Sequence, residues 1–155
     1  MTMRKFTLIA LAALASLTTL TALATLPTPV APPATADKHH AMYAACAKVC
    51  ADCMLTCEMT AHHCAELVAA GKKEHAKPMA VAADCAEFCA LSAKLTARHS
   101  DLAAASCEAC AKACDFCAAE CAKHEAMPEM KACVESCKKC AASCREMAKM
   151  TGHGH

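Results

Sequence analysis

The chain of 155 residues has very few aromatic side chains and no excess of charge of either sign. It contains no tryptophan, one tyrosine and three phenylalanines, so it offers no platform on which nucleic-acid bases could stack. The formal net charge is +1, and the sequence has no basic patch. Its three glycines form no phosphate-binding loop. These absences exclude a nucleic-acid partner and leave no sign of an enzyme.

Large aliphatic residues are also scarce. No isoleucine follows Ile9, and leucine, valine and phenylalanine are sparse beyond the amino-terminal segment. Sixteen cysteines are present instead, a content typical of secreted scaffolds that are built from disulfides and loops. With only three glycines and six prolines, and with abundant alanine, lysine and glutamate, the composition is helical rather than loop-rich.

The first 36 residues are typical of an export signal. Arg4 and Lys5 precede an apolar run over residues 6–24, and Ala34-Thr35-Ala36 fits a signal-peptidase site. The sequence therefore predicts a signal peptide over residues 1–36 and a domain over residues 37–155 that works in the periplasm or another extracytoplasmic compartment, with no membrane contact after cleavage. A cut after Ala24 and an uncleaved membrane anchor remain alternatives.

Periodicity and helix-ending residues predict four helices, over residues of about 41–70, 78–99, 101–124 and 129–150. Gly71 follows the first helix, Ser100 is expected to cap the third with help from Asp101, and Pro128 opens the fourth. Connections this short force neighbouring helices to run antiparallel. The predicted fold is an all-α, up-down-up-down four-helix bundle with a cysteine-lined core.

The cysteines recur at helical spacing. They step by four, three and four over residues 46–57, by three, four, three and four over 107–121, and by four, three and four over 133–144. Such steps keep side chains on one narrow face of a helix. In the second predicted helix the stripe of Cys85 and Cys89 continues with Ser92 and Thr96. A core of this kind buries little hydrocarbon, so metal binding is expected to supply much of the folding free energy.

Several chemistries of clustered thiols can be compared. Cysteines three or four residues apart on one helix are too far apart for a good disulfide, although pairing between facing helices remains open. The consecutive C-x-x-C steps of ferredoxins are absent, and zinc knuckles place their C-x-x-C pairs on turns rather than within helices. Cu(I) accepts two or three soft ligands, so neighbouring thiolates along a stripe suit it. Sharing of thiolates predicts a capacity of roughly a dozen to eighteen ions.

The expected ligands fall into two sets. One set contains imidazole and thioether ligands near one end of the predicted bundle, namely His63, Met79 and Met130. To it we add His39, which would be the third residue in a chain cleaved after Ala36 and would hold Cu(II) together with the free amine. The thiolate ligands are Cys46, Cys50, Cys53, Cys57, Cys64, Cys85, Cys89, Cys107, Cys110, Cys114, Cys117, Cys121, Cys133, Cys137, Cys140 and Cys144.

The stretches CAKVCADCMLTC, CEACAKACDFCAAEC and CVESCKKCAASC resemble the bacterial copper storage proteins, over residues 41–149. That resemblance implies a four-helix bundle whose inward cysteines hold many Cu(I) ions, Met and His ligands toward one end, association as a homotetramer, and an unidentified protein that accepts the copper. With the export signal before them, these stretches resemble the exported branch of that family.

The sequence is thus interpreted as an extracytoplasmic protein that stores or buffers Cu(I), and not as an enzyme. Two alternatives remain open: a structural helical protein stapled by disulfides, and a copper chaperone that carries only one or two ions.

Overall fold

The computed structural model describes residues 34–151 of the chain, all of which belong to one compact unit. Its long helices are α1 (Ala34–Ala69), α2 (Ala76–Ala97), α3 (Ala103–Cys121) and α4 (Pro128–Thr151). Two short 3₁₀ helices, η1 (Lys73–His75) and η2 (Ala122–His124), lie in the first and third connections. Residues 34–151 contain no strand.

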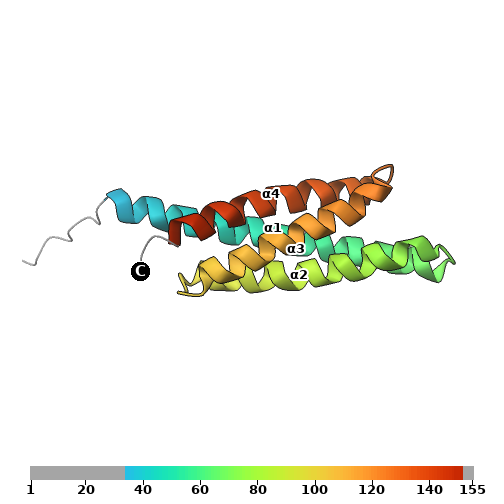
Figure 1. Ribbon diagram of the computed structural model, residues 1–155, viewed down its shortest axis with the longest axis horizontal. Coiled ribbons are helices and arrows are strands. Elements are labelled where there is room, and N and C mark those ends of the chain that lie inside the picture. The colour runs from blue at the N-terminus through green and yellow to red at the C-terminus, as the bar shows by residue number, and fades with distance from the viewer. Residues whose placement is uncertain (1–33, 152–155) are drawn as a thin grey trace, which may run out of the picture. The chain divides into compact units, whose positions relative to one another are not determined.

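The helices form an antiparallel bundle in which each helix packs against two others (Figure 1). Helix α1 lies against α2 and α4, and α3 lies against the same two helices. Short connections explain this arrangement, because a helix that follows a short connection packs antiparallel to the helix before it. The predicted all-α four-helix bundle is therefore confirmed.

Helix α1 begins at Ala34, seven residues before the predicted start. Residues 34–40 contain neither glycine nor proline, so nothing in them interrupts a helix that continues into the cysteine stripe. The predicted signal peptide lies outside the described residues except for positions 34–36, which form the first residues of α1.

The ends of α1 and α2 share one hydrogen-bond pattern. After α1, Gly71 has φ of 90°, and the N–H groups of Gly71 and Lys72 donate to the carbonyls of Val68 and Leu67, at 3.0 Å each. After α2, His99 takes the equivalent position with φ of 52°. This is the Schellman arrangement, which satisfies carbonyls left free at a helix end.

The third helix begins at Ala103, two residues later than predicted, and Leu102 rather than Ser100 is its N-cap, without a side-chain cap bond. Ser100 instead holds the turn that leads into the helix. The hydroxyl of Ser100 accepts a hydrogen bond from the N–H of Leu102 at 3.2 Å, and the Ser100 carbonyl accepts one from Ala103 at 2.9 Å. Both bonds satisfy donors that would lack a partner in the first turn. The order of caps and short turns thus sets the register in which the four cysteine stripes meet.

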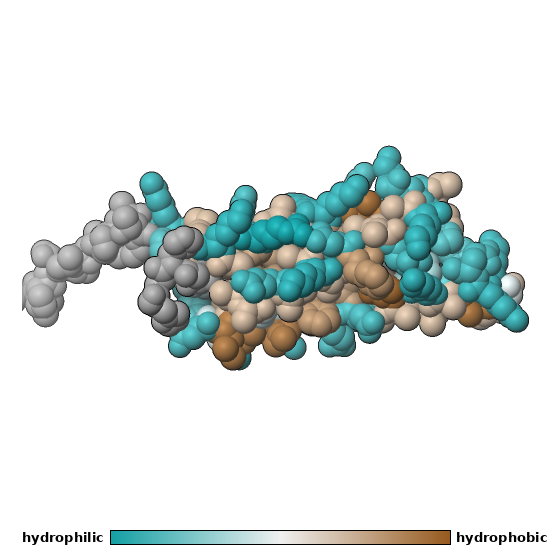
Figure 2. Space-filling model, in the orientation of Figure 1, coloured by the Kyte–Doolittle hydropathy of each residue, from teal (hydrophilic) through white to brown (hydrophobic). Residues whose placement is uncertain are grey.

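The core of the bundle is made of cysteine and alanine rather than of large aliphatic residues. All sixteen cysteines are at most 2% exposed, and Val81, Leu95 and Val134 are among the few aliphatic residues buried with them. Hydrophilic residues cover much of the visible surface over α4, whereas hydrophobic residues gather over α2 and α3 (Figure 2). Such a core buries less hydrocarbon per residue than a leucine-rich one.

Candidate metal centre

The sixteen buried cysteine sulfurs lie along the inside of the bundle, and we call them the thiol row. Helix α1 contributes five of them, α2 two, α3 five and α4 four. Each helix turns its stripe inward because the opposite positions carry charged residues such as Lys48 and Asp52, which pair with each other in solvent. The structure therefore brings all sixteen predicted thiolate ligands into one interior.

All sixteen cysteines are free thiols. The shortest sulfur–sulfur separation between helices is 3.4 Å, between Cys50 of α1 and Cys144 of α4. Other neighbours on facing helices, such as Cys57 and Cys137, lie 3.7 Å apart. These distances exceed a disulfide bond of about 2.05 Å and match thiols in mutual contact.

Five groups along the thiol row have ligand sulfurs that lie within 4.8 Å of one another. Neighbouring groups share members, so the row is continuous rather than divided into separate sites. Shared thiolates can bridge ions, which allows many Cu(I) ions to occupy one row. In order along the axis, the groups are Cys46, Cys107 and Cys144; Cys50, Cys110, Cys140 and Cys144; Cys53, Cys89, Cys114 and Cys140; Cys53, Cys85, Cys114 and Cys137; and Cys57, Cys117, Cys133 and Cys137.

Thiol-to-thiol hydrogen bonds shift the acidity of the row in both directions. Bonds from Cys114, Cys137 and Cys140 lower the pKa of Cys53 by stabilising its thiolate. At Cys64 no such partner lies close, so burial raises its pKa to about 11, with the nearby Cys133 and Cys117 adding to the shift. The thiols of the row therefore differ in acidity according to their thiol neighbours.

Helix α2 contributes hydroxyls where the other helices contribute thiols. Ser92 and Thr96 are fully buried, as their places in the stripe predict. The Ser92 hydroxyl donates to the carbonyl of Ser106 at 2.9 Å, and Thr96 lies 3.6 Å from the sulfur of Cys107. These bonds satisfy the hydroxyls, so the row loses thiol ligands on this side without gaining unpaired polar groups.

At the end of the bundle where α1 ends and α4 begins, the side chains near the axis carry imidazole and thioether groups instead of thiols. Met130 is fully buried there, and Met79 is half-buried against the core. His63 is half-buried, and its Nε2 has no hydrogen-bond partner; the Glu129 carboxylate is 3.8 Å away. We call this region the His75 end, after the histidine that closes it.

His75 lies in η1, and only 5% of its surface is exposed. Its ring packs on that of His124 in η2, with 4.6 Å between ring centroids. Its Nδ1 is buried without a hydrogen-bond partner. Burial, together with the neighbouring His124, lowers the pKa of His75, so the ring is held neutral. A neutral imidazole with a free nitrogen is a competent metal ligand.

The opposite end of the bundle is closed differently. Met147 is 1% exposed and belongs to the same buried core as the cysteines, while the ring of Tyr43 stacks on His99 with centroids 4.2 Å apart. His39 is exposed near the start of α1 and belongs to none of the metal-compatible groups among the described residues. Its role as a ligand therefore stays a prediction.

The fold and the site define a class: an all-helical bundle whose interior is a row of thiols able to take up soft metal ions. The copper storage protein family matches residues 38–149, and the chain belongs to this family. A comparison with curated proteins finds no match. In the described part of the chain, no helix has the length and apolarity needed to span a membrane.

Two solved structures are similar to this chain. The Nmul_A1745 protein from Nitrosospira multiformis is 32% identical, with a TM-score of 0.61, and the match covers 74% of this chain and 98% of that protein. A cytosolic copper storage protein from Streptomyces lividans, solved with five coppers, is 27% identical with a TM-score of 0.63. That match covers 73% of this chain and 97% of the other.

Proposed function

We propose that this protein stores Cu(I), with roughly a dozen to eighteen ions bound per chain by the thiol row. The observation that carries the proposal is the burial of sixteen free thiols along one axis, fourteen of them in overlapping groups. Cu(I) is bound by two or three soft ligands. Because neighbouring groups share thiols, one thiolate can bind two neighbouring ions. The proposed role is binding, with no chemical step.

The two alternatives differ from storage in thiol content and stoichiometry. A disulfide-stapled protein would show few reactive thiols after denaturation without reductant, whereas a storage protein would show close to sixteen thiols. A chaperone would protect two or three thiols on saturation with copper, and a storage row nearly all of them. Counting reactive thiols before and after saturation with Cu(I) distinguishes the three. Fewer than four protected thiols would refute the proposal.

We propose that copper enters at the His75 end. Met79, Met130 and His63 lie there, where the thiol row stops at Cys64, and thioether and imidazole groups bind Cu(I) more labilely than thiolates do. His75 extends this set, because its neutral ring keeps an unpaired nitrogen. The closed packing of Met147 at the opposite end supports the same direction.

We further propose that the protein is exported, with residues 1–36 removed. The apolar run at residues 6–24 and the Ala34-Thr35-Ala36 sequence support this. The similar protein from Streptomyces lividans is cytosolic, so the proposal depends on this chain's own amino-terminal sequence. Amino-terminal sequencing of protein from cell fractions tests it: Asp37 as first residue in the extracytoplasmic fraction is expected, and an intact amino terminus in the cytosol would contradict it.

Cleavage after Ala36 would also create an amino-terminal Cu(II) site. The free amine of Asp37 and the imidazole of His39, with the amide nitrogens between them, could form a square-planar set. Adding one residue before Asp37 should abolish the square-planar Cu(II) spectrum. Persistence of that spectrum in the extended protein would refute the site.

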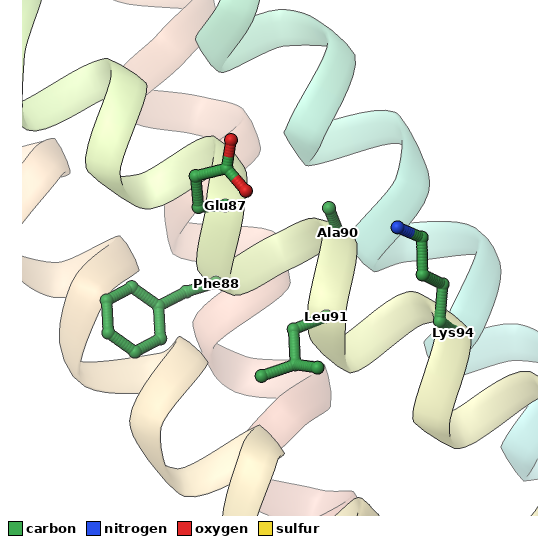
Figure 3. Close-up of a pocket in the computed structure, with 5 residues that line it drawn as sticks. All are labelled: Glu87, Phe88, Ala90, Leu91 and Lys94. Carbon is green, nitrogen blue, oxygen red and sulfur yellow. The ribbon is translucent and has the colours of Figure 1, made fainter.

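We propose that copies of the chain associate as a homotetramer through α2 and α3. Phe88 and Leu91 are 42% and 50% exposed on α2, and Phe116 is 58% exposed on α3. In Figure 3, Phe88 and Leu91 point to one side of α2, while Glu87 and Lys94 point away from them. An exposed apolar face with a charged border is typical of an interface. Sedimentation of the wild type and of F88E/L91E tests this, with loss of the tetramer expected in the variant.

A further inference from the structure

The middle of the thiol row differs from its ends in the number of helices that supply it. At the centre, Cys53 of α1, Cys85 of α2, Cys114 of α3 and Cys137 of α4 form one group, so each helix gives one thiol. The outer groups draw on only three helices, because α2 has no cysteine besides Cys85 and Cys89.

The sulfur separations in this central group match a tetrahedron around a small divalent ion. A zinc–sulfur bond of about 2.3 Å gives an edge of about 3.8 Å between sulfurs in a regular tetrahedron. The separations are 3.7 Å for Cys85 and Cys114, 3.9 Å for Cys53 and Cys137, and 4.0 Å for Cys85 and Cys137. The remaining pairs lie within 4.8 Å.

A second group, one turn along, repeats the arrangement with Cys89 and Cys140 in place of Cys85 and Cys137. There Cys89 lies 3.7 Å from Cys114 and 3.9 Å from Cys140. Because both groups use Cys53 and Cys114, a single divalent ion that takes four thiolates can occupy only one of them at a time. All six sulfurs are at most 1% exposed, so the ion would have no open coordination position.

We propose that the centre of the bundle is a closed tetrathiolate site for one divalent d¹⁰ ion of the zinc class, ligated by one cysteine from each of the four helices. A zinc knuckle needs a C-x-x-C pair on a turn, whereas this site takes each of its four ligands from a different helix. With four protein ligands and no water, the geometry is that of a structural zinc site.

Such an ion would tie all four helices together in the copper-free protein, whose cysteine and alanine core buries little hydrocarbon. Binding releases the thiol protons, and Cu(I) entering the row would later displace the divalent ion by ligand exchange without any change of oxidation state. This role is independent of copper storage, so either proposal can fail alone.

The test is a titration of the reduced, metal-free protein with Zn²⁺ against a competing chelator, with Co²⁺ as the spectroscopic probe. The first equivalent should give the visible bands of a tetrahedral cobalt–thiolate ion. The double variant C85S/C89S should bind the first Co²⁺ or Zn²⁺ ion more than about a hundredfold more weakly. Loss of a residue that only hydrogen-bonds to a metal ligand already costs roughly ten- to a hundredfold in affinity. Serine is tolerated in this stripe, as the buried Ser92 shows.

The matched control is C46S/C121S, which also removes two buried thiols but touches neither central group. It should bind the first equivalent like the wild type. Equal binding by the two double variants, or an octahedral cobalt spectrum in the wild type, would overturn the proposal. If C85S/C89S does not fold, anomalous scattering at the zinc edge from wild-type crystals decides: an ion between the four central sulfurs supports the site, and an ion bound only by surface histidines refutes it.

Discussion

The inward positions of this protein carry cysteine where most helical bundles carry leucine. The core can therefore bind soft metal ions. A free cysteine packs as a small hydrophobe, so the helices can associate around it before any metal is bound. The same side chain becomes a soft metal ligand once it loses its proton. One residue type therefore provides both the packing and the binding, and the balance between the two depends on thiol acidity.

Cys64 allows this acidity to be tested. Burial raises its pKa to about 11 in the folded chain from an ordinary value of 9.0, so the folded state holds this proton more tightly than the unfolded state does. Stability from this group is therefore fully present below pH 9 and is lost as pH rises through about 11. We expect the reduced, metal-free protein to lose roughly 2–3 kcal/mol from this group between pH 8.5 and 11.

Urea unfolding of the wild type and of C64S, both reduced, measures this loss at each pH. Because serine does not titrate in this range, the variant should lose less stability than the wild type over the same interval. Identical pH dependence in the two proteins would show that Cys64 is not the group responsible.

Helix ends set the register in which the four stripes face each other. Gly71 has φ of 90°, a conformation that a residue with a Cβ adopts at a cost, and a Cβ placed there would meet no atom within 4 Å. The cost of Gly71→Ala is therefore conformational alone, and we expect a loss of about 1–2 kcal/mol in the free energy of unfolding. Gly71→Asn should lose less, because asparagine tolerates this region. Thermal or urea unfolding measures both, and equal losses would contradict the explanation.

Glu120 and His75 are buried near the His75 end, and the spacing of residues in the sequence does not predict their burial. Glu120 of α3 is 7% exposed and accepts a hydrogen bond from Lys123 at 2.7 Å, while Lys77 of α2 lies 3.5 Å away. The bond from Lys123 keeps the pKa of Glu120 below its usual range. His75 is buried by contacts between two connections.

The bundle, the inward stripes and the hydroxyls of Ser92 and Thr96 could be predicted from the sequence, because helical periodicity fixes which residues share a face. The start of α1 at Ala34 was predicted seven residues too late, although Pro32 and Pro33 stand directly before Ala34 in the sequence and could have indicated it. The burial of His75 and Glu120 could not be predicted, because it depends on which connections meet. For the same reason, the overlap of thiol groups between helices required the structure.

The thioethers at the His75 end lead to a kinetic prediction. Met130 is fully buried and Met79 half-buried, so replacing both by leucine keeps volume while removing the soft sulfur. M79L/M130L should take up Cu(I) several-fold more slowly than the wild type and still reach the same final content. Stopped-flow transfer from a Cu(I) chelator measures the rate. M59L, which alters a methionine that is 65% exposed on α1, is the control, and equal rates in the two variants would place the entrance elsewhere.

For the complete chain, metal binding and folding are expected to be coupled. A ligand present at a thousand times its Kd stabilises the folded state by about 4 kcal/mol, which raises Tm by the order of 15 °C for a domain of this size. We therefore expect the copper-loaded protein to melt at least about 15 °C above the reduced, metal-free protein, as followed by circular dichroism. Equal melting temperatures would show that the cysteine and alanine core is sufficient without metal.

The storage capacity of the thiol row is the central claim, and anaerobic titration of the reduced protein with Cu(I) against a competing chelator tests it most directly. Sixteen buried thiols, fourteen of them in overlapping groups, predict tight uptake of roughly a dozen to eighteen ions per chain, with nearly all thiols protected at saturation. Saturation at one or two ions, with most thiols still reactive, would contradict storage and assign the protein to the copper chaperones.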